Sequence, residues 1–226
     1  MRTTYRKLIF IGVLFVLSQL LSGHALAQKS TSGSVRNEIL MKASSPFEDL
    51  TEFAISGDRR GIKRALREYD AQATRLENTL QPAVRNKFKS LVANIKQAER
   101  HANYNAIALK SPEAYRVLIE ALDRSSIKIP AEVLLLDYVG FRYLAVLHSN
   151  PGDWPALQEA ATYAQKNWDA IKSKVTDMGL RDAIDVTMKG LMQACTKKNG
   201  EMALFAAQVD LAQVDLLEAY FDKSGK

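Results

Sequence analysis

Apolar residues recur at helical spacing through most of this chain, and one segment is apolar on nearly every face. Between Val133 and Leu147 only Asp137 and Arg142 are charged. A helix that is apolar all round has to be covered on every side by other elements. We therefore expect Pro130 to His148 to form a buried central helix around which the rest of the chain packs.

Four further segments carry a narrower apolar stripe, in which apolar residues are separated by three or four positions and charged residues lie between them. This pattern is typical of long helices packed at shallow angles, as in an antiparallel bundle. The predicted long helices run from Asp58 to Leu80, from Pro82 to about Leu109, from Pro155 to Met178 and from Leu180 to Cys195.

Shorter helices are indicated by residues that favour helix starts. A serine followed by a proline, at Ser45-Pro46 and again at Ser111-Pro112, is typical of a cap and a first helical position. A last helix is expected from Glu201 to about Phe221, and its most regular apolar stripe predicts its buried face. That stripe consists of Phe205, Val209, Ala212, Leu216 and Tyr220.

No run of residues alternates apolar and polar positions with β-branched enrichment, so we expect no significant sheet. The sequence therefore predicts an all-α fold, namely an antiparallel helical bundle of four long helices with additional short helices. A solenoid of helix pairs is the alternative, but no fixed period repeats along the chain.

The first 27 residues have the pattern of a secretory signal peptide. A basic start is followed by an apolar run from Leu8 to Leu21 and by the small-residue motif Ala25-Leu26-Ala27. We expect cleavage before Gln28. An uncleaved N-terminal membrane anchor is the alternative, but the apolar run is short for a span and the small residues would serve no purpose.

Removal of residues 1–27 would take away three basic residues and no acidic one, so the formal charge would fall from +6 to +3. This small surplus does not indicate a nucleic-acid partner. No later segment has the roughly 18 uncharged residues of a membrane span. We expect a periplasmic or secreted protein in which residues 28–44 form a flexible arm and residues 45–223 form a single helical-bundle domain.

Sulfur-containing residues give one candidate site. Met188, Met192 and Cys195 lie four and three positions apart, on one face of a predicted helix. Thioethers and a thiolate suit Cu(I), so the sequence predicts a possible copper site. Ordinary core packing is the alternative, because methionine and free cysteine are common core residues. Covalent c-type haem is not expected, since Cys195 is the only cysteine and is not followed by histidine.

The charges of the central helix give a second candidate site. A buried charge needs a partner, and Asp137 is expected to meet an Arg or Tyr from a neighbouring helix. Together with Tyr138, Arg142 and Tyr143 it could line an internal polar pocket for a small ligand. A purely structural salt bridge is the alternative.

Motifs of enzymes are missing from the sequence, including phosphate loops, nucleophile elbows and paired zinc-binding histidines. We therefore expect a non-catalytic, exported binding protein that holds a metal ion such as copper or a small ligand. The alternative is a scaffold that docks on another exported protein through charged helix faces. Basic residues crowd the helix after Asp58, whereas the last helix has no Lys or Arg between Glu201 and Asp222.

Overall fold

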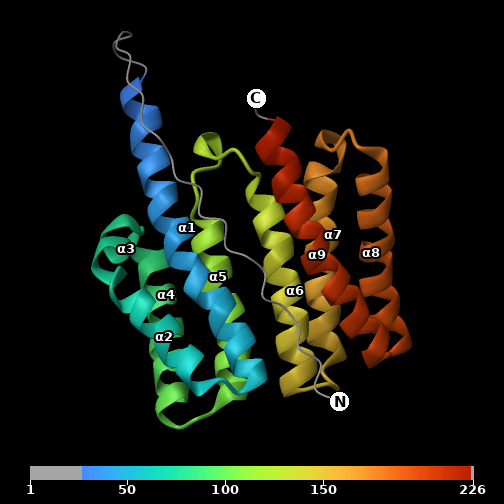
Figure 1. Ribbon diagram of the computed structural model, residues 1–226, viewed down its shortest axis with the longest axis horizontal. Helices are drawn as coiled ribbons and strands as arrows, with labels where there is room; N and C mark the ends of the chain where they lie inside the picture. The colour runs from blue at the N-terminus through green and yellow to red at the C-terminus, as the bar shows by residue number, and fades with distance from the viewer. Residues whose placement is uncertain (1–26, 225–226) are drawn as a thin grey trace.

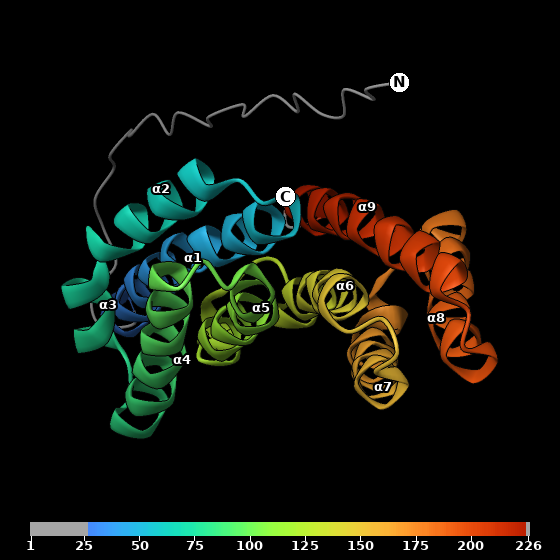
Figure 2. The same cartoon turned by 90° about the horizontal axis from the view of Figure 1, so that it is seen from below.

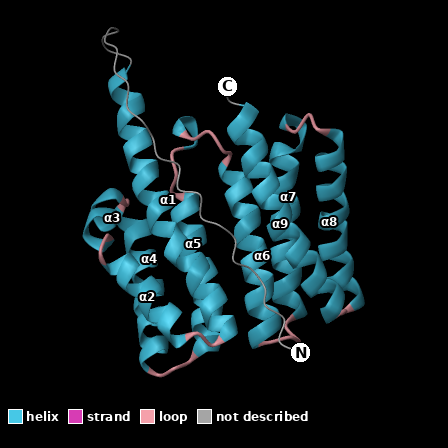
Figure 3. Ribbon diagram, viewed as in Figure 1, coloured by secondary structure: helices cyan, strands magenta, loops and turns pink. Residues whose placement is uncertain are grey.

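A computed structural model describes residues 27–224 of the 226-residue chain, so the predicted signal peptide lies outside the described residues apart from Ala27. All regular structure in the described part is helical, and it contains no strand (Figure 3). The all-α prediction is confirmed. No helix among the described residues is long and apolar enough to cross a membrane.

Most of the helices run up and down the molecule and are joined by short turns (Figure 1). In chain order they are α1 (Ala27–Ser56), α2 (Arg59–Asp70), α3 (Ala73–Thr79), α4 (Pro82–Arg100), α5 (Tyr104–Glu120), α6 (Ala131–Ser149), α7 (Trp154–Ile171), α8 (Met178–Lys197) and α9 (Gly200–Ser224).

The central layer of the molecule consists of α5 and α6, which pack against each other. On one side of this layer α1 packs against α5, and α9 packs against α6 (Figure 2). On the other side α4 packs against α5, and α7 packs against α6. The far end is closed by α8, which contacts both α7 and α9. One surface of the α5–α6 layer therefore lies between α1 and α9, and the opposite surface lies between α4 and α7.

The predicted central helix is confirmed. It begins one residue after Pro130, ends at Ser149 and buries most of its side chains, including Leu135 and Val139. Four helices, α1, α5, α7 and α9, contact it. Its nearly uniform apolar surface is therefore satisfied by contacts on all sides.

The predicted flexible arm at residues 28–44 is wrong, because these residues belong to α1. Asn37, Leu40 and Ala43 are buried on one face of this helix. The Asn37 amide Nδ2 donates to the Asp123 carbonyl at 2.8 Å, and the Asp123 backbone N–H donates to Asn37 Oδ1 at 2.8 Å. A few small and polar contacts thus order a segment whose composition is typical of a loop.

The predicted helix starts at Ser45 and Ser111 are also wrong. Pro46 lies inside α1 and Pro112 lies inside α5. A proline inside a helix deprives the carbonyl four residues earlier of its donor, which for Pro46 is the carbonyl of Lys42. In α1 the Gln72 side chain replaces that donor, because its Nε2 lies 3.3 Å from the Lys42 carbonyl.

Three predicted long helices are shorter than expected. The one expected from Pro155 to Met178 ends, as α7, at Ile171. The segment after Asp58 is divided into α2 and α3 by a turn at Ala71 and Gln72. The segment after Pro82 ends at Arg100, well before the expected end.

The predicted buried stripe of the last helix faces outward. Phe205 is 69% exposed and Leu216 is 57% exposed. The buried face of α9 is built mainly from smaller residues, namely Ala203, Ala206, Ala207, Asp210, Val214 and Leu217. Glycines on the two neighbouring helices allow α9 to approach them closely. A Cβ built on Gly140 of α6 would lie 2.5 Å from Leu211, and one on Gly190 of α8 would lie 3.6 Å from Ala206.

These two glycines give a matched pair of substitutions. Gly140→Ala would overpack the α6–α9 contact, and we expect a loss of about 1–3 kcal/mol in unfolding free energy. Gly190→Ala makes only an ordinary contact and gains helix propensity, so it should be neutral or stabilising by up to about 1 kcal/mol. Urea unfolding of both variants checks the difference. Equal effects would contradict the close approach of α6 and α9.

Candidate functional site

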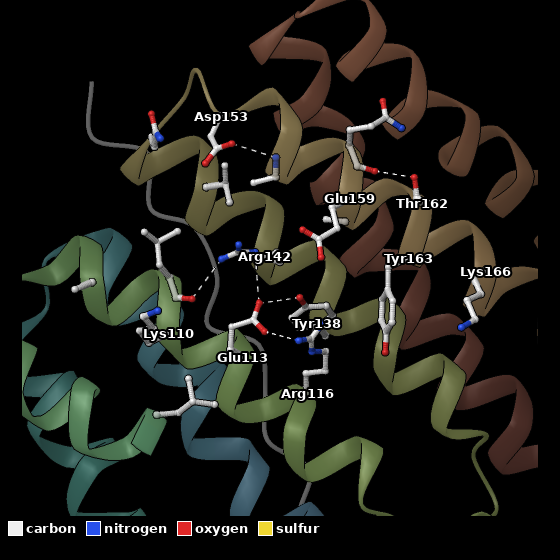
Figure 4. Close-up of a pocket in the computed structure, with 18 of the residues that line it drawn as sticks. Lys110, Glu113, Arg116, Tyr138, Arg142, Asp153, Glu159, Thr162, Tyr163 and Lys166 are labelled. Carbon is white, nitrogen blue, oxygen red and sulfur yellow. Dashed lines mark hydrogen bonds and ion pairs between the residues drawn. The ribbon is translucent and has the colours of Figure 1, made fainter. Parts of the chain in front are cut away.

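A groove with a volume of about 910 Å³ lies on one face of the α5–α6 layer, between α4 and α7 (Figure 4). Its floor carries Glu113 and Arg116 of α5 together with Tyr138 and Arg142 of α6. The walls come from α4 on one side and α7 on the other. The volume is at the upper end of the range found for small-molecule sites.

Glu113 is at the centre of a polar network in the floor. The Tyr138 hydroxyl donates to Glu113 Oε1 at 2.8 Å. Arg116 Nη2 lies 2.9 Å from Glu113 Oε2, and Arg142 Nε lies 3.5 Å from Glu113 Oε1. The side chain of Glu113 is only 21% exposed. One partly buried carboxylate is thus shared by two guanidinium groups and a phenol, as the dashed lines in Figure 4 show.

Two tyrosine rings fix the position of Arg116. Its guanidinium carbon lies 5.1 Å from the centre of the Tyr138 ring and 5.8 Å from that of Tyr163. The two rings meet edge to face, and the Tyr163 hydroxyl donates to Glu120 at 3.0 Å. Burial opposes the charge of Arg116, but the combined attraction of Glu113, Tyr138, Glu120 and Tyr163 outweighs it, so the pKa of Arg116 is raised. Arg116 is therefore a fixed cation in the floor.

The charges around the groove are mainly positive. Its only acidic lining residues are Glu113, Asp153 and Glu159, and the Asp153 carboxylate accepts from the Ala156 backbone N–H at the start of α7. The basic lining residues outnumber them and lie on all four helices. They are Lys87, Lys110, Arg116, Arg142 and Lys166.

The four residues predicted for a polar pocket do not share one cavity. Tyr138 and Arg142 line the groove, as expected. Asp137 lines a separate cavity on the opposite face of the α5–α6 layer. Tyr143 is fully buried and faces α8, where its hydroxyl lies 3.2 Å from Cys195 Sγ. Each residue along a helix turns by about 100°, so neighbours such as Asp137 and Tyr138 point in different directions.

The partners of Arg142 were not identified from the sequence. Glu113 and Arg116 are three positions apart on α5, a spacing that places them side by side on a helix. This signal was available in the sequence. The spacing alone, however, does not show that this pair faces Arg142 of α6.

The predicted sulfur site lies on the buried side of α8. Met188 is 1% exposed, and Cys195 Sγ contacts the Tyr143 hydroxyl. Met192 Sδ accepts from Gln158 Nε2 at 3.3 Å. Burial raises the pKa of Cys195, although its hydrogen bond with Tyr143 lowers it in part. The thiol form is thereby favoured over the thiolate that binds metals.

The arrangement of the sulfur atoms thus resembles core packing. Among the described residues, no group of three or more His, Cys, Asp or Glu side chains could hold a metal ion. Copper binding at Met188, Met192 and Cys195 stays a prediction. The metal content of the purified chain and of a Cys195→Ser variant would decide it, since equal metal-free samples would exclude the site.

Comparison with protein-family models, with curated proteins and with solved structures finds no match for this chain. Its function must therefore be inferred from the chemistry of its own residues.

The Glu113 network yields a prediction about stability. Glu113→Gln keeps the shape of the side chain but leaves Arg116 and Arg142 without their carboxylate. We expect a loss of about 1–3 kcal/mol in unfolding free energy, because both guanidiniums are only partly exposed to water. Glu159→Gln, on the α7 wall, is the control and should change stability by less than about 0.5 kcal/mol. Thermal and urea unfolding measure both, and indistinguishable variants would refute the central role of Glu113.

Proposed function

We propose that the protein is an exported, non-catalytic binding protein that holds a small organic anion in the groove between α4 and α7. The observation that carries this proposal is the sharing of Glu113 by Arg116 and Arg142 in the groove floor. Two guanidiniums against one carboxylate leave one positive charge uncompensated in a partly buried place. Such a charge favours an anionic ligand.

Arg142 is the residue that would contact the anion. It uses Nε toward Glu113 and Nη1 toward the Leu109 carbonyl, at 3.5 Å in each case. Within the described residues its Nη2 group has no hydrogen-bond partner, and it is not among the buried unsatisfied atoms. A guanidinium held by two bonds and open at its remaining donors suits a carboxylate, sulfonate or phosphate group.

The rest of the groove supports an organic rather than an inorganic anion. Leu91, Leu109 and Val146 line it together with the rings of Tyr138 and Tyr163. A ligand with an apolar body and one acidic group would therefore match both the side walls and the floor.

The hydroxyl groups of the groove favour binding over catalysis. Tyr138 donates to Glu113, Tyr163 donates to Glu120, and Thr162 donates to the Gln158 carbonyl. Each hydroxyl is thus committed to an acceptor that fixes its position, and none is paired with a histidine in the described groove. This is a pattern of recognition, with preorganised charges and apolar walls.

Export is the second part of the proposal, and it is supported by the signal-like pattern of residues 1–27. Cleavage there would leave Gln28 at the N-terminus. N-terminal analysis of the chain recovered from the periplasm or the medium checks this, and a chain that keeps residues 1–27 in the cytoplasm would contradict it.

A pair of fluorescent dyes tests the binding proposal. The anionic dye 8-anilinonaphthalene-1-sulfonate should bind the groove, whereas its uncharged analogue N-phenyl-1-naphthylamine should bind more weakly. Arg142→Gln should lower the affinity for the anionic dye about tenfold, which corresponds to one charged hydrogen bond of about 1.4 kcal/mol. The uncharged dye should be unaffected by this change.

Arg75→Gln is the matched control, since Arg75 is an exposed arginine on α3, away from the groove. Equal affinities of the anionic dye for the Arg142→Gln and Arg75→Gln variants would show that the groove does not bind it. Circular dichroism should confirm that both variants are folded.

Docking on another exported protein is a second candidate function, and the outward face of α9 favours it. Phe205 and Leu216 are exposed on a helix whose charged residues are all acidic as far as Asp222. Exposed large apolar residues on one helix face are typical of protein contacts. A Phe205→Ser variant should then lose a co-purifying partner while keeping the affinity of the groove for the dye, and unchanged recovery of the partner would exclude this face.

A further inference from the structure

A second cavity, of about 220 Å³, lies on the opposite face of the α5–α6 layer, between α1 and α9. Four carboxyl groups line it: Glu48 of α1, Asp137 of α6, and Asp215 and Glu218 of α9. No lysine, arginine or histidine is among its lining residues. The cavity therefore concentrates acidic groups where the groove on the other face concentrates basic ones.

Asp137 is the innermost of these carboxyls. It makes no hydrogen bond and no ion pair with any described residue. It is partly exposed and lines the cavity, so its carboxyl group is accessible from that space. Removing a polar group from bulk water without giving it a partner is costly. The cavity thus contains an acceptor that the protein itself does not satisfy.

The neighbouring groups make this environment more acidic. From α9 the Asp210 side chain, 1% exposed, adds an Oδ2 atom with no partner. Burial raises the pKa of Asp210 to about 8. Burial also raises the pKa of Asp137 well above its usual range, and Glu48, Glu218, Asp210 and Asp215 raise it further.

Glu48 responds to its surroundings in the same way. Burial raises its pKa to about 8, and the charges of Glu218, Asp49 and Glu52 act in the same direction. Hydrogen bonding with the Tyr115 hydroxyl of α5 lowers it in part. Every charged group that shifts the pKa of Glu48 or Asp137 is an acid, so no cation of the protein compensates this cluster.

We propose that this cavity binds a small aliphatic amine in its ammonium form, with Asp137 and Glu48 accepting the ammonium N–H groups. The apolar lining residues Ile119, Leu134 and Val214 would contact the methylene groups of such a ligand. The carboxyls occupy separate walls contributed by three helices, which suits a ligand whose donors are spread over several bonds. The volume is below that of a drug-sized site, so the ligand is short.

Calorimetric titration of the full chain with 1,4-diaminobutane tests this inference. Binding should be observed at pH 9 and should weaken at least about tenfold at pH 6, because the raised pKa values leave the carboxyls protonated there. Asp137→Asn keeps the size of the side chain but removes its charge, and should weaken binding at pH 9 about tenfold. Glu48→Gln is a second variant with the same expected direction.

Asp182→Asn, at an exposed acid on α8, is the control and should bind like the unaltered chain. No heat of binding at pH 9 to a chain shown to be folded would overturn the inference. So would equal affinity of the Asp137→Asn, Glu48→Gln and Asp182→Asn variants, or displacement of the amine by Mg²⁺, Ca²⁺ or Zn²⁺ alone at equal concentration. Arg142→Gln should not weaken amine binding, which separates this cavity from the groove.

Discussion

Complete coverage of α6 is the constraint on which this structure depends. A helix with so few polar positions cannot face water on any side, so other helices must contact it around its whole circumference. The chain meets this requirement with α5 beside it, α7 on one face and α9 on the other, while α1 reaches it from beyond α5. The order of the remaining helices follows from that arrangement, since α4 and α8 cover what α5, α7 and α9 leave open.

The few polar residues of α6 then determine where binding chemistry can occur. Tyr138 and Arg142 emerge between α5 and α7 and meet Glu113. Asp137 emerges between α1 and α9 and meets other acids. One helix therefore supplies a positive surface to one side of the layer and a negative surface to the other. This separation of charge is an unusual property for a helix that is otherwise apolar.

The sequence predicted the elements more reliably than their faces. An apolar stripe is visible in α9, but Phe205 and Leu216 belong to its outer face, because another face of α9 packs closely against Gly140 and Gly190. Periodicity shows which residues share a face of a helix. It does not show which face is buried when one face carries large side chains and the other carries small ones. Close packing between backbones depends on residues of two distant helices and cannot be read from either alone.

The helix starts predicted at two prolines were wrong for a similar reason. A proline inside a helix is unfavourable locally, so Pro46 and Pro112 were interpreted as starts. The structure keeps both helices continuous, and at Pro46 the Gln72 side chain, from the turn between α2 and α3, satisfies the freed carbonyl. One consequence was that residues 28–44, which belong to α1, were predicted to form a flexible arm. The central charged residues were found, but their partners required the fold.

The adjacency of Asp137 and Tyr138 has a consequence for how the two faces of α6 influence each other. A group that contacts Asp137 and a group that contacts Tyr138 are separated only by the thickness of one helix, on the order of 10 Å. Opposite unit charges at that distance attract by about 1.7 kcal/mol at an effective dielectric constant of about 20. An anion on one face would therefore strengthen the hold on a cation on the other, and by thermodynamic reciprocity the cation would strengthen the hold on the anion to the same degree. The central helix would then separate two oppositely charged ligands by a distance short enough for their charges to interact. Both interacting charges would belong to the ligands and not to the protein.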